Sequence, residues 1–586
     1  MALHRDHTSK RRAFDSEIEL PNTEFSEQLH AEKYRSQGES FREAMNRNAG
    51  AVTQTQEEFQ ALRSITHDQR FLMGGRNQSA LGSTRNVTPY NCFVSGVIED
   101  SFVEGHGSIM ERAKEAATTM RMGGGIGYDF STLRPRGALI KKLDSFSSGP
   151  ITFMEIFDAV CRCTASSGHR RGAQMGVLRV DHPDIEEFIH SKQNEHKLRG
   201  FNISIAVTDE FMRAVEGGDS FDLRWGGEVY RTIDARRLWE TIMRSTWDWA
   251  EPGVIFIDRL NEMNNLHYCE TLSTTNPCGE QPLPPFGACL LGSFNLVKYL
   301  YHPDWSDPES YLFDYVQFAK DIPVVVRAMD NVVDVASYPL FEQEQEAKNK
   351  RRMGLGVTGM ANCIEAMGFP YGSPSFIATM ETILGAMTEG CYRASMELAK
   401  EKGAFPLFNA KEYMKSRFIE TLPIELQRDI EDHGIRNSHL TSIAPTGTIS
   451  MCADNVSSGI EPVFGFEVER TFQTFDGAKT LNVRDFGHEF LEVRGKTIAD
   501  VTVEEHLAVL ATATRYMDSA VSKTVNVPHD VDWNDFKDVY VKAWKLGCKG
   551  ITTYRIGGKR EGILKVAEET SEACKFDPLT GLRECE

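Results

Sequence analysis

The chain has 586 residues, 41% of them hydrophobic and 25% charged, which is ordinary for a soluble globular protein. Its 65 basic and 84 acidic residues give a net charge of −19, which argues against a surface that coats nucleic acid. No run of about eighteen apolar residues is present, and the charged N-terminus lacks the apolar stretch of a signal peptide. We therefore expect no membrane partner, no nucleic-acid partner and a cytoplasmic location.

The chain divides into three predicted parts. Residues 1–90 form a polar extension and a helical region, with a helical stretch at 25–34. From about residue 57 strands and helices alternate, which predicts an α/β fold. The second part, residues 91–562, contains predicted strands at 201–207 and 253–257, and predicted helices at 109–122, 238–249 and 376–402. Residues 563–586 form a polar, flexible tail.

The twelve cysteines are scattered, without a CxxC pair or the Cys/His spacing of a zinc site. We therefore expect no metal centre. In a reducing compartment most of these cysteines should be buried thiols or redox-active groups, because structural disulfides are rare there.

A short proline-containing segment, Asn276-Pro277-Cys278-Gly279-Glu280, is the first candidate site. Pro277 biases Asn276 towards extended backbone, and in an extended segment alternate residues share a face. An amide, a thiol and a carboxylate would then point to one side, where apolar residues would normally be buried. The pattern indicates a reactive site; the alternative is a proline-rich surface loop with an incidental cysteine.

Two further segments suggest backbone that approaches a ligand. Ala444-Pro445-Thr446-Gly447-Thr448-Ile449-Ser450 predicts a tight turn, and before a helix such a turn binds phosphate through N–H groups and the helix dipole. The alternative for this segment is an ordinary loop. The glycine-rich run Met122–Phe130 matches neither the P-loop nor the dinucleotide fingerprint.

Taken together, these segments resemble the catalytic protein of ribonucleotide reductases, most closely the adenosylcobalamin-dependent class, class II. The resemblance is carried by NPCGEQPLPPFGACLLGSFNL (276–296), RNVTPYNCFV (85–94), GGGIG (123–127) and SIAPTGTIS (442–450). It covers roughly residues 57–586. It implies a ten-stranded α/β barrel of two antiparallel five-strand halves with a central finger loop.

The resemblance also implies roles for individual residues. Cys278 becomes a thiyl radical, Glu280 is the general base for the 3′-hydroxyl, and Asn276 positions the ribose hydroxyls. Cys92 and Cys289 form the reducing dithiol, although without the resemblance Cys92 would be taken for an ordinary buried thiol. The implied substrate-binding residues are Asn91, Gly125, Pro445, Thr446, Gly447, Thr448 and Ile449.

A second nucleotide site and a redox tail follow from the same resemblance. Deoxynucleoside triphosphate or ATP effectors would select the base to be reduced, and the candidate effector residues are Asp100, Ser101, His169, Arg170, Arg171 and Gln174. By itself, Arg170-Arg171 would be interpreted as a solvated basic pair. No pattern resembles the ATP-cone module. Cys574 and Cys585 would pass electrons by thiol exchange from a thioredoxin-like reductant to the buried dithiol.

The expected activity is reduction of ribonucleotides, and of ribonucleoside diphosphates in particular, to 2′-deoxyribonucleotides, started by adenosylcobalamin. Reductases that import a radical use adjacent tyrosines, whereas Tyr554 has a threonine beside it. The alternatives are a class I-type large subunit served by a separate metalloprotein and a non-catalytic nucleotide-binding regulator. The residues that contact cobalamin cannot be assigned, and either a monomer or a homodimer is compatible with the sequence.

Overall fold

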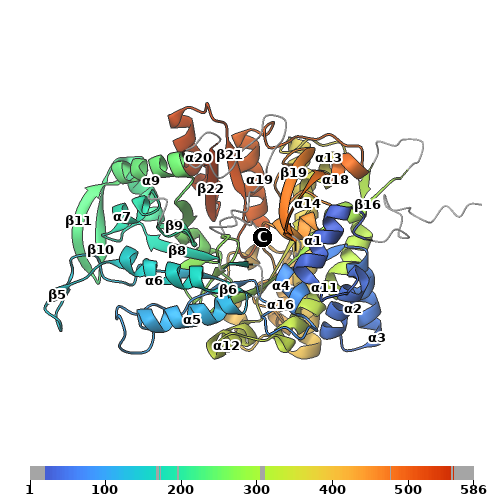
Figure 1. Ribbon diagram of the computed structural model, residues 1–586, viewed down its shortest axis with the longest axis horizontal. Helices are drawn as coiled ribbons and strands as arrows, with labels where there is room; N and C mark the ends of the chain where they lie inside the picture. The colour runs from blue at the N-terminus through green and yellow to red at the C-terminus, as the bar shows by residue number, and fades with distance from the viewer. Residues whose placement is uncertain are drawn as a thin grey trace, which may run out of the picture.

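The computed structural model describes residues 20–166, 170–171, 173–193, 197–303, 311–474, 477–555 and 559. At its centre lies a ten-stranded sheet in the order β1-β15-β2-β3-β8-β9-β12-β22-β21, with β18 paired to β15 (Figure 1). The strands are β1 (Phe71–Met73), β2 (Cys92–Val94), β3 (Gly125–Asp129), β8 (Gln174–Arg179), β9 (Phe201–Val207), β12 (Gly253–Phe256), β15 (Ala288–Asn295), β18 (Met353–Thr358), β21 (Thr524–Val527) and β22 (Gly550–Arg555). The predicted α/β class is confirmed.

The strands of this sheet fall into groups of parallel strands that run in opposite directions. Strands β2, β3, β8, β9 and β12 all run parallel to one another. At the two ends of this run the direction reverses, because β15 is antiparallel to β2 and β22 is antiparallel to β12. Strand β18 is parallel to β15, and β21 is parallel to β22. Two parallel bridges, Leu355 with Thr441 and Ile443 with Val521, connect β18 through segment 441–443 to the residues just before β21.

The strand sequences explain why this sheet is central. All eight residues of β15 are buried, as in a strand that is covered on both faces. Strand β9 has the sequence FNISIAV, rich in β-branched residues, and six of its seven residues are buried. Both strands predicted from the sequence, at 201–207 and 253–257, are present as β9 and β12, with β12 ending one residue earlier.

The long helices begin and end where the sequence supplies caps. The predicted helix 238–249 is α9 (Ala235–Trp249), which begins three residues earlier because the Asp234 carboxylate accepts a hydrogen bond from Arg237 N at 3.0 Å. Helix α14 (Pro374–Lys402) begins after the cap Ser373 and ends at Gly403, whose φ is +81°. The predicted helix 109–122 is α5 (Ile109–Arg121). Within the described residues, no helix combines the length and the apolar character needed to cross a membrane.

The remaining elements surround the sheet. The predicted helical N-terminal region is confirmed, and its helices α1–α3 lie beside α11, opposite the side that carries α7, α9 and the β10–β11 hairpin (Figure 1). Strand β1 follows α3 and pairs with β15, so this region is joined to the central sheet.

The bounds of the helices not yet given are α1 (Glu24–Tyr34), α2 (Phe41–Val52), α3 (Gln56–His67), α4 (Gly75–Ala80), α6 (Pro150–Cys163), α7 (Ile185–His190), α8 (Asp209–Gly217), α10 (Ile257–Glu262), α11 (Tyr315–Val335), α12 (Phe341–Lys350), α13 (Met360–Ala366), α15 (Ala410–Tyr413), α16 (Ile424–His433), α17 (Gly447–Met451), α18 (Phe486–Phe490), α19 (Val503–Tyr516) and α20 (Trp533–Lys545). Six two-stranded hairpins complete the described fold: β4 (Leu139–Ile140) with β5 (Ser145–Phe146), β6 (Ala165–Ser166) with β7 (Arg170–Arg171), β10 (Ser220–Trp225) with β11 (Glu228–Asp234), β13 (Thr274–Thr275) with β14 (Pro282–Leu283), β16 (Leu300–Tyr301) with β17 (Leu312–Phe313), and β19 (Glu467–Thr474) with β20 (Gly477–Arg484).

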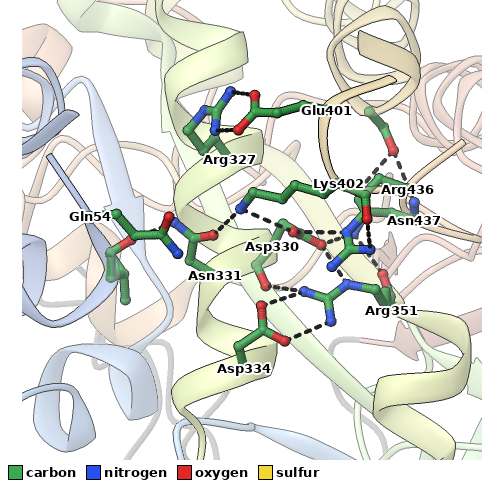
Figure 2. Close-up of polar contacts among 12 residues, drawn as sticks. Gln54, Arg327, Asp330, Asn331, Asp334, Arg351, Glu401, Lys402, Arg436 and Asn437 are labelled. Atoms are coloured by element: carbon green, nitrogen blue, oxygen red, sulfur yellow. Dashed lines mark hydrogen bonds and ion pairs between the residues drawn. The ribbon is translucent and has the colours of Figure 1, made fainter. Parts of the chain in front are cut away.

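A buried charge network anchors the start of β18 (Figure 2). Its centre is the fully buried Asp330 of α11, whose carboxylate accepts hydrogen bonds from Arg351 Nε at 2.8 Å, Arg436 Nε at 3.2 Å and Asn437 Nδ2 at 2.9 Å. Lys402 Nζ, at the end of α14, lies 3.8 Å from the same carboxylate. The network therefore ties two helices to the residues that lead into β18 and into segment 441–443.

Candidate active site

The segment around Cys278 is the loop of a small hairpin inside the fold. Strand β13 pairs with β14, and residues 276–281 connect them. The loop is closed by hydrogen bonds from Asn276 N to Gln281 O at 3.0 Å and from Gly279 N to Asn276 O at 3.1 Å. Gly279 has a φ of +84°, a conformation that glycine adopts without strain. Cys278 therefore lies at the tip of a tight turn.

This turn corrects one sequence-based expectation. We expected an extended segment in which Asn276, Cys278 and Glu280 share a face, and this extended conformation is wrong. Pro277 instead occupies the second position of a β-turn, where its fixed φ is equally well suited. The amide, thiol and carboxylate are thus grouped by a turn and not by strand alternation.

The two sides of the loop rest on different parts of the sheet. On one side, a Cβ added to Gly127 of β3 would lie 1.8 Å from Thr275 O, and one added to Gly125 would lie 3.0 Å from Pro277 Cγ. On the other side, the carbonyl oxygen of Glu280 accepts hydrogen bonds from Ala520 N at 3.0 Å and Ser442 Oγ at 3.1 Å. In the structure, Gly125 makes room for the loop; its contact with a ribose stays a prediction.

Four of the five predicted catalytic residues are in direct contact or directly opposite one another. Asn276 Nδ2 donates to Cys92 Sγ at 3.1 Å, and the Cys92 thiol lies 3.7 Å from Glu280 Oε1. Cys92 of β2 faces Cys289 of β15 in the antiparallel register. Such directly opposed residues have Cα atoms about 4.5–5.5 Å apart, which is within the range of a disulfide. Both thiols are free in the structure, so this pair could be oxidised without moving the strands.

Burial sets the protonation of these groups. Burial raises the pKa of Glu280 to about 7, so this carboxyl group can gain or lose a proton near neutral pH. Burial also raises the pKa values of Cys92 and Cys289 well above the usual range, with the Glu280 carboxylate adding to the effect at Cys92. Both thiols are therefore neutral S–H groups at physiological pH, and Cys278, in contrast, is only half-buried.

The predicted phosphate loop lies next to the dithiol. Ala444 packs in one cluster with Cys92 and Cys289, and the loop continues into the short helix α17 (Gly447–Met451). Thr446 has a φ of +56°, and its hydroxyl contacts Thr358 Oγ1 at 2.9 Å and accepts from Gly459 N at 2.7 Å. These contacts fix the turn that contains the predicted residues 445–449. The first N–H groups of such a helix have no partner within the helix.

Asn91, the other predicted substrate residue, immediately precedes Cys92. Its backbone carbonyl accepts a hydrogen bond from Gly125 N at 2.9 Å. Its side-chain Oδ1 is buried and, among the described residues, has no hydrogen-bond partner. Asn91 therefore has an unsatisfied acceptor, which would lie 3.1 Å from a Cβ added to Gly74.

The described members of the predicted effector site stand in different elements, Asp100 and Ser101 before α5, Arg170 and Arg171 in β7, and Gln174 in β8. Asp100 accepts hydrogen bonds from Arg134 Nε at 2.6 Å and from Arg134 N at 3.1 Å, and Ser101 Oγ donates to Glu104 O at 2.7 Å. Gln174 is buried in the core, where it accepts from Tyr128 and donates to Phe157 O. Both polar ends of its side chain are therefore hydrogen-bonded to core residues in this structure. Arg170 and Arg171 form strand β7. His169, Cys574 and Cys585 lie outside the described residues.

Gln281 is a site residue that the sequence analysis missed. Its backbone N–H donates to Asn276 Oδ1 at 2.9 Å and so orients the amide that contacts Cys92. Its side chain is completely buried next to Glu280. The motif NPCGEQ contains this residue, but a rule based on alternate residues passes over it. The available signal in the sequence was an amide directly after Glu280, in the same loop as Cys278.

Comparisons with known proteins show the family of this chain. The sequence matches the family described as "Ribonucleotide reductase, barrel domain" over residues 90–484 and 490–554. The "Vitamin B12-dependent ribonucleoside-diphosphate reductase" of Mycobacterium tuberculosis strain H37Rv is 34% identical over 577 residues, which covers 92% of this chain and 77% of the relative. A protein of the same name from Thermoplasma acidophilum is 34% identical and covers 81% of this chain and 62% of the relative. The "Vitamin B12-dependent ribonucleotide reductase" of Streptomyces coelicolor is 29% identical, covering 82% and 58% respectively. Because the family match extends along most of its length and a relative is 34% identical, the chain belongs to the ribonucleotide reductase family.

Proposed function

We propose that this chain reduces ribonucleotides, with ribonucleoside diphosphates as the preferred substrates, to 2′-deoxyribonucleotides by thiyl-radical chemistry. One observation carries the proposal: Cys92 is in contact with both Asn276 and Glu280 of the loop that carries Cys278, while it faces Cys289 across the strands. This arrangement combines a reactive thiol, a general base and a two-electron reductant in one buried site. The relatives named as reductases of ribonucleoside diphosphates support the choice of substrate.

The proposed architecture is a closed barrel around the loop. One half consists of the five parallel strands β2, β3, β8, β9 and β12, and the other of β15, β18, segment 441–443, β21 and β22 running the opposite way. The support is that the bridges at Thr441 and Ile443 connect the two open ends of the second group. The loop 276–281 then acts as a central finger, because it contacts β3 on one side and residues 442 and 520 on the other.

The residues of the chain divide the reaction between them. The Cys278 sulfur takes the hydrogen from C3′ of the ribose and returns it at the end of the cycle. Glu280 accepts the 3′-hydroxyl proton as general base, and its pKa near 7 suits this task. The 2′-hydroxyl leaves as water after gaining a proton. Cys92 and Cys289 together give up two electrons and two protons and become a disulfide, and C2′ is thereby reduced.

The proposed cofactor is adenosylcobalamin, which when bound supplies the 5′-deoxyadenosyl radical that takes hydrogen from the Cys278 thiol. The loop tip fits such a group, because Cys278 is only half-buried and a Cβ on Gly279 would meet no atom within 4 Å. Accessible space therefore exists beside the thiol that must react. Cys278 and Gly279 would face the cofactor; the vitamin B12-dependent names of the relatives point to the same group.

Regulation and reduction are further parts of the proposal. Nucleotide effectors would act near Asp100 and Ser101, and a thioredoxin-like protein would re-reduce the dithiol through Cys574 and Cys585, in a monomer or a homodimer. The resemblance to the family supports these assignments. The burial of Cys289, which no folded reductant could contact directly, supports a carrier.

An anaerobic turnover assay with and without adenosylcobalamin tests the proposal. Wild type should make deoxyribonucleotide only with the cofactor and a thiol reductant. Cys278→Ser should make none while it still binds ribonucleotide, because a hydroxyl cannot form the required radical. Cys269→Ser, which replaces an exposed thiol outside the loop, should retain activity. Activity restored by a metalloprotein partner without cobalamin, or product from Cys278→Ser, would contradict the proposal.

A further inference from the structure

The side chain of Gln281 is in an unusual position for a glutamine. It is completely buried, and within the described residues neither its Oε1 nor its Nε2 has a hydrogen-bond partner. An unsatisfied buried polar group costs about 1–3 kcal/mol. Packing does not explain why the chain keeps an amide here, because a leucine of similar size would avoid this cost.

The surroundings of the amide place it on the face of the sheet that carries the dithiol. A Cβ added to Gly354 of β18 would lie 2.3 Å from Gln281 Nε2 and 2.9 Å from Leu291 Cδ2. Gly354 is paired with Leu291, and Leu291 belongs to one cluster with Cys92 and Cys289. The absence of a side chain at Gly354 therefore leaves room for this amide beside the reactive cysteines.

Among the described residues, no group forms a hydrogen bond with the amide. Leu291 and Ser442 both lie beside the same position at Gly354. Leu291 is apolar, and the Ser442 hydroxyl donates its hydrogen to Glu280 O, so it does not donate to Gln281 Oε1. The adjacent Glu280 has a second unsatisfied acceptor, because its Oε2 is buried and has no partner among the described residues. Two neighbouring side chains thus present unsatisfied polar atoms to the same interior.

The chemistry of these atoms limits the possible ligand. Gln281 Oε1 and Glu280 Oε2 both need a donor, whereas Gln281 Nε2 needs an acceptor. Phosphate oxygens accept but do not donate at neutral pH, so a phosphate group would leave the two acceptors unsatisfied. A pair of vicinal hydroxyls supplies donors and acceptors together. We propose that the Gln281 amide binds the 2′,3′-diol of the ribonucleotide, next to Glu280, and thereby recognises ribose.

This inference deepens the proposed function and rests on it. The test compares equilibrium binding of a ribonucleoside diphosphate and its 2′,3′-dideoxy analogue, without cobalamin so that no turnover occurs. In Gln281→Leu the affinity for the ribonucleotide should fall by about tenfold, the loss expected for hydrogen bonds of this kind, while that for the dideoxy analogue stays unchanged. The thermal midpoint of the free protein should stay equal or rise, since two unsatisfied polar atoms are removed. If Gln281 had only a structural role, Gln281→Leu would lower the thermal midpoint of the free protein.

Two more variants make the test independent of that single substitution. Gly354→Ala places a methyl group where the amide lies and should reduce the discrimination between the two nucleotides in the same way. Gln343→Leu is the matched control, because Gln343 is also a fully buried glutamine but bonds Thr119 at 3.1 Å. It should lower the thermal midpoint and leave both affinities unchanged.

The possible outcomes separate the two proposals. Equal weakening for both nucleotides would place the amide against the base or the phosphates and overturn the assignment. Unchanged binding in Gln281→Leu would mean that ordered water satisfies the amide, and would overturn it too. If wild type itself binds no ribonucleotide, the proposed function is wrong. That result would contradict the function of the whole site and would be distinct from a failure of the Gln281 assignment.

Discussion

At the scale of single residues, the site depends on one burial effect acting on groups of different chemistry. The interior that raises the pKa of Glu280 to about 7 also keeps the Cys92 and Cys289 thiols protonated. The carboxyl group can therefore exchange protons under conditions in which the dithiol holds both of its own. A general base and a hydrogen-donating reductant can operate side by side for this reason.

The first prediction concerns the pH dependence of Glu280. A general base must be ionised, so kcat should rise as the pH increases through about 7 and level off above it. Glu280→Gln should lose this limb of the profile together with nearly all turnover, while it continues to bind ribonucleotide. A profile that stays flat between pH 6 and pH 8 in wild type would contradict the role of Glu280.

The second prediction is that the free energy of unfolding falls as the pH rises, whereas kcat rises. A carboxyl group whose pKa is raised on folding stabilises the protein below its ordinary pKa, and this contribution is lost as the pH rises through the folded pKa. Wild type should therefore lose about 3 kcal/mol relative to Glu280→Gln between pH 4.5 and pH 8, at ~1.4 kcal/mol per pKa unit. Urea unfolding of both proteins at the two pH values measures this difference. A constant difference across that range would show that Glu280 keeps its ordinary pKa.

At the scale of elements, the network around Asp330 holds the start of β18 and the approach to segment 441–443 (Figure 2). Asp330→Asn leaves Arg351, Arg436 and Lys402 without their buried anion, so we expect a loss of about 3–5 kcal/mol in unfolding free energy. Asp334→Asn is the control, because that carboxylate also pairs with Arg351 but is 50% exposed and should contribute less than ~1 kcal/mol. Denaturant titrations compare the two variants, and equal losses would rule out a special role for burial.

Elements with a regular local pattern could be predicted from the sequence, whereas contacts between distant segments could not. Strands β9 and β12 and helices α5, α9 and α14 lie close to their predicted positions. The bridge between Leu355 and Thr441 joins residues 86 positions apart through a single pair, and no local pattern marks it. The extended backbone expected for residues 276–280 is wrong, because a proline favours both an extended segment and a turn. Gln281 was missed, since only the tertiary structure shows that its amide is unsatisfied.

At the scale of the whole molecule, the depth of the dithiol determines how it can be reduced. Cys289 is 0% exposed and Cys92 is 4% exposed, so a thioredoxin-like protein cannot reach either sulfur in the folded chain. Thiol exchange requires direct attack of one sulfur on another. An intermediate carrier is therefore needed, and we propose Cys574 and Cys585 for this part.

The last prediction follows from that depth. Replacing both Cys574 and Cys585 with serine should slow multiple turnover with a thioredoxin system, because the oxidised Cys92–Cys289 pair is not regenerated. The first turnover should be spared, since it uses the dithiol that is already reduced. Dithiothreitol is small enough to enter the interior and should partly restore multiple turnover.

The exposed thiols Cys163 and Cys269 provide a matched control, because replacing both with serine should change neither assay. Product per enzyme in a pre-reduced single-turnover experiment is the decisive measurement: if the tail variant makes none, Cys574 and Cys585 act in the chemical step or in folding, and not as a carrier.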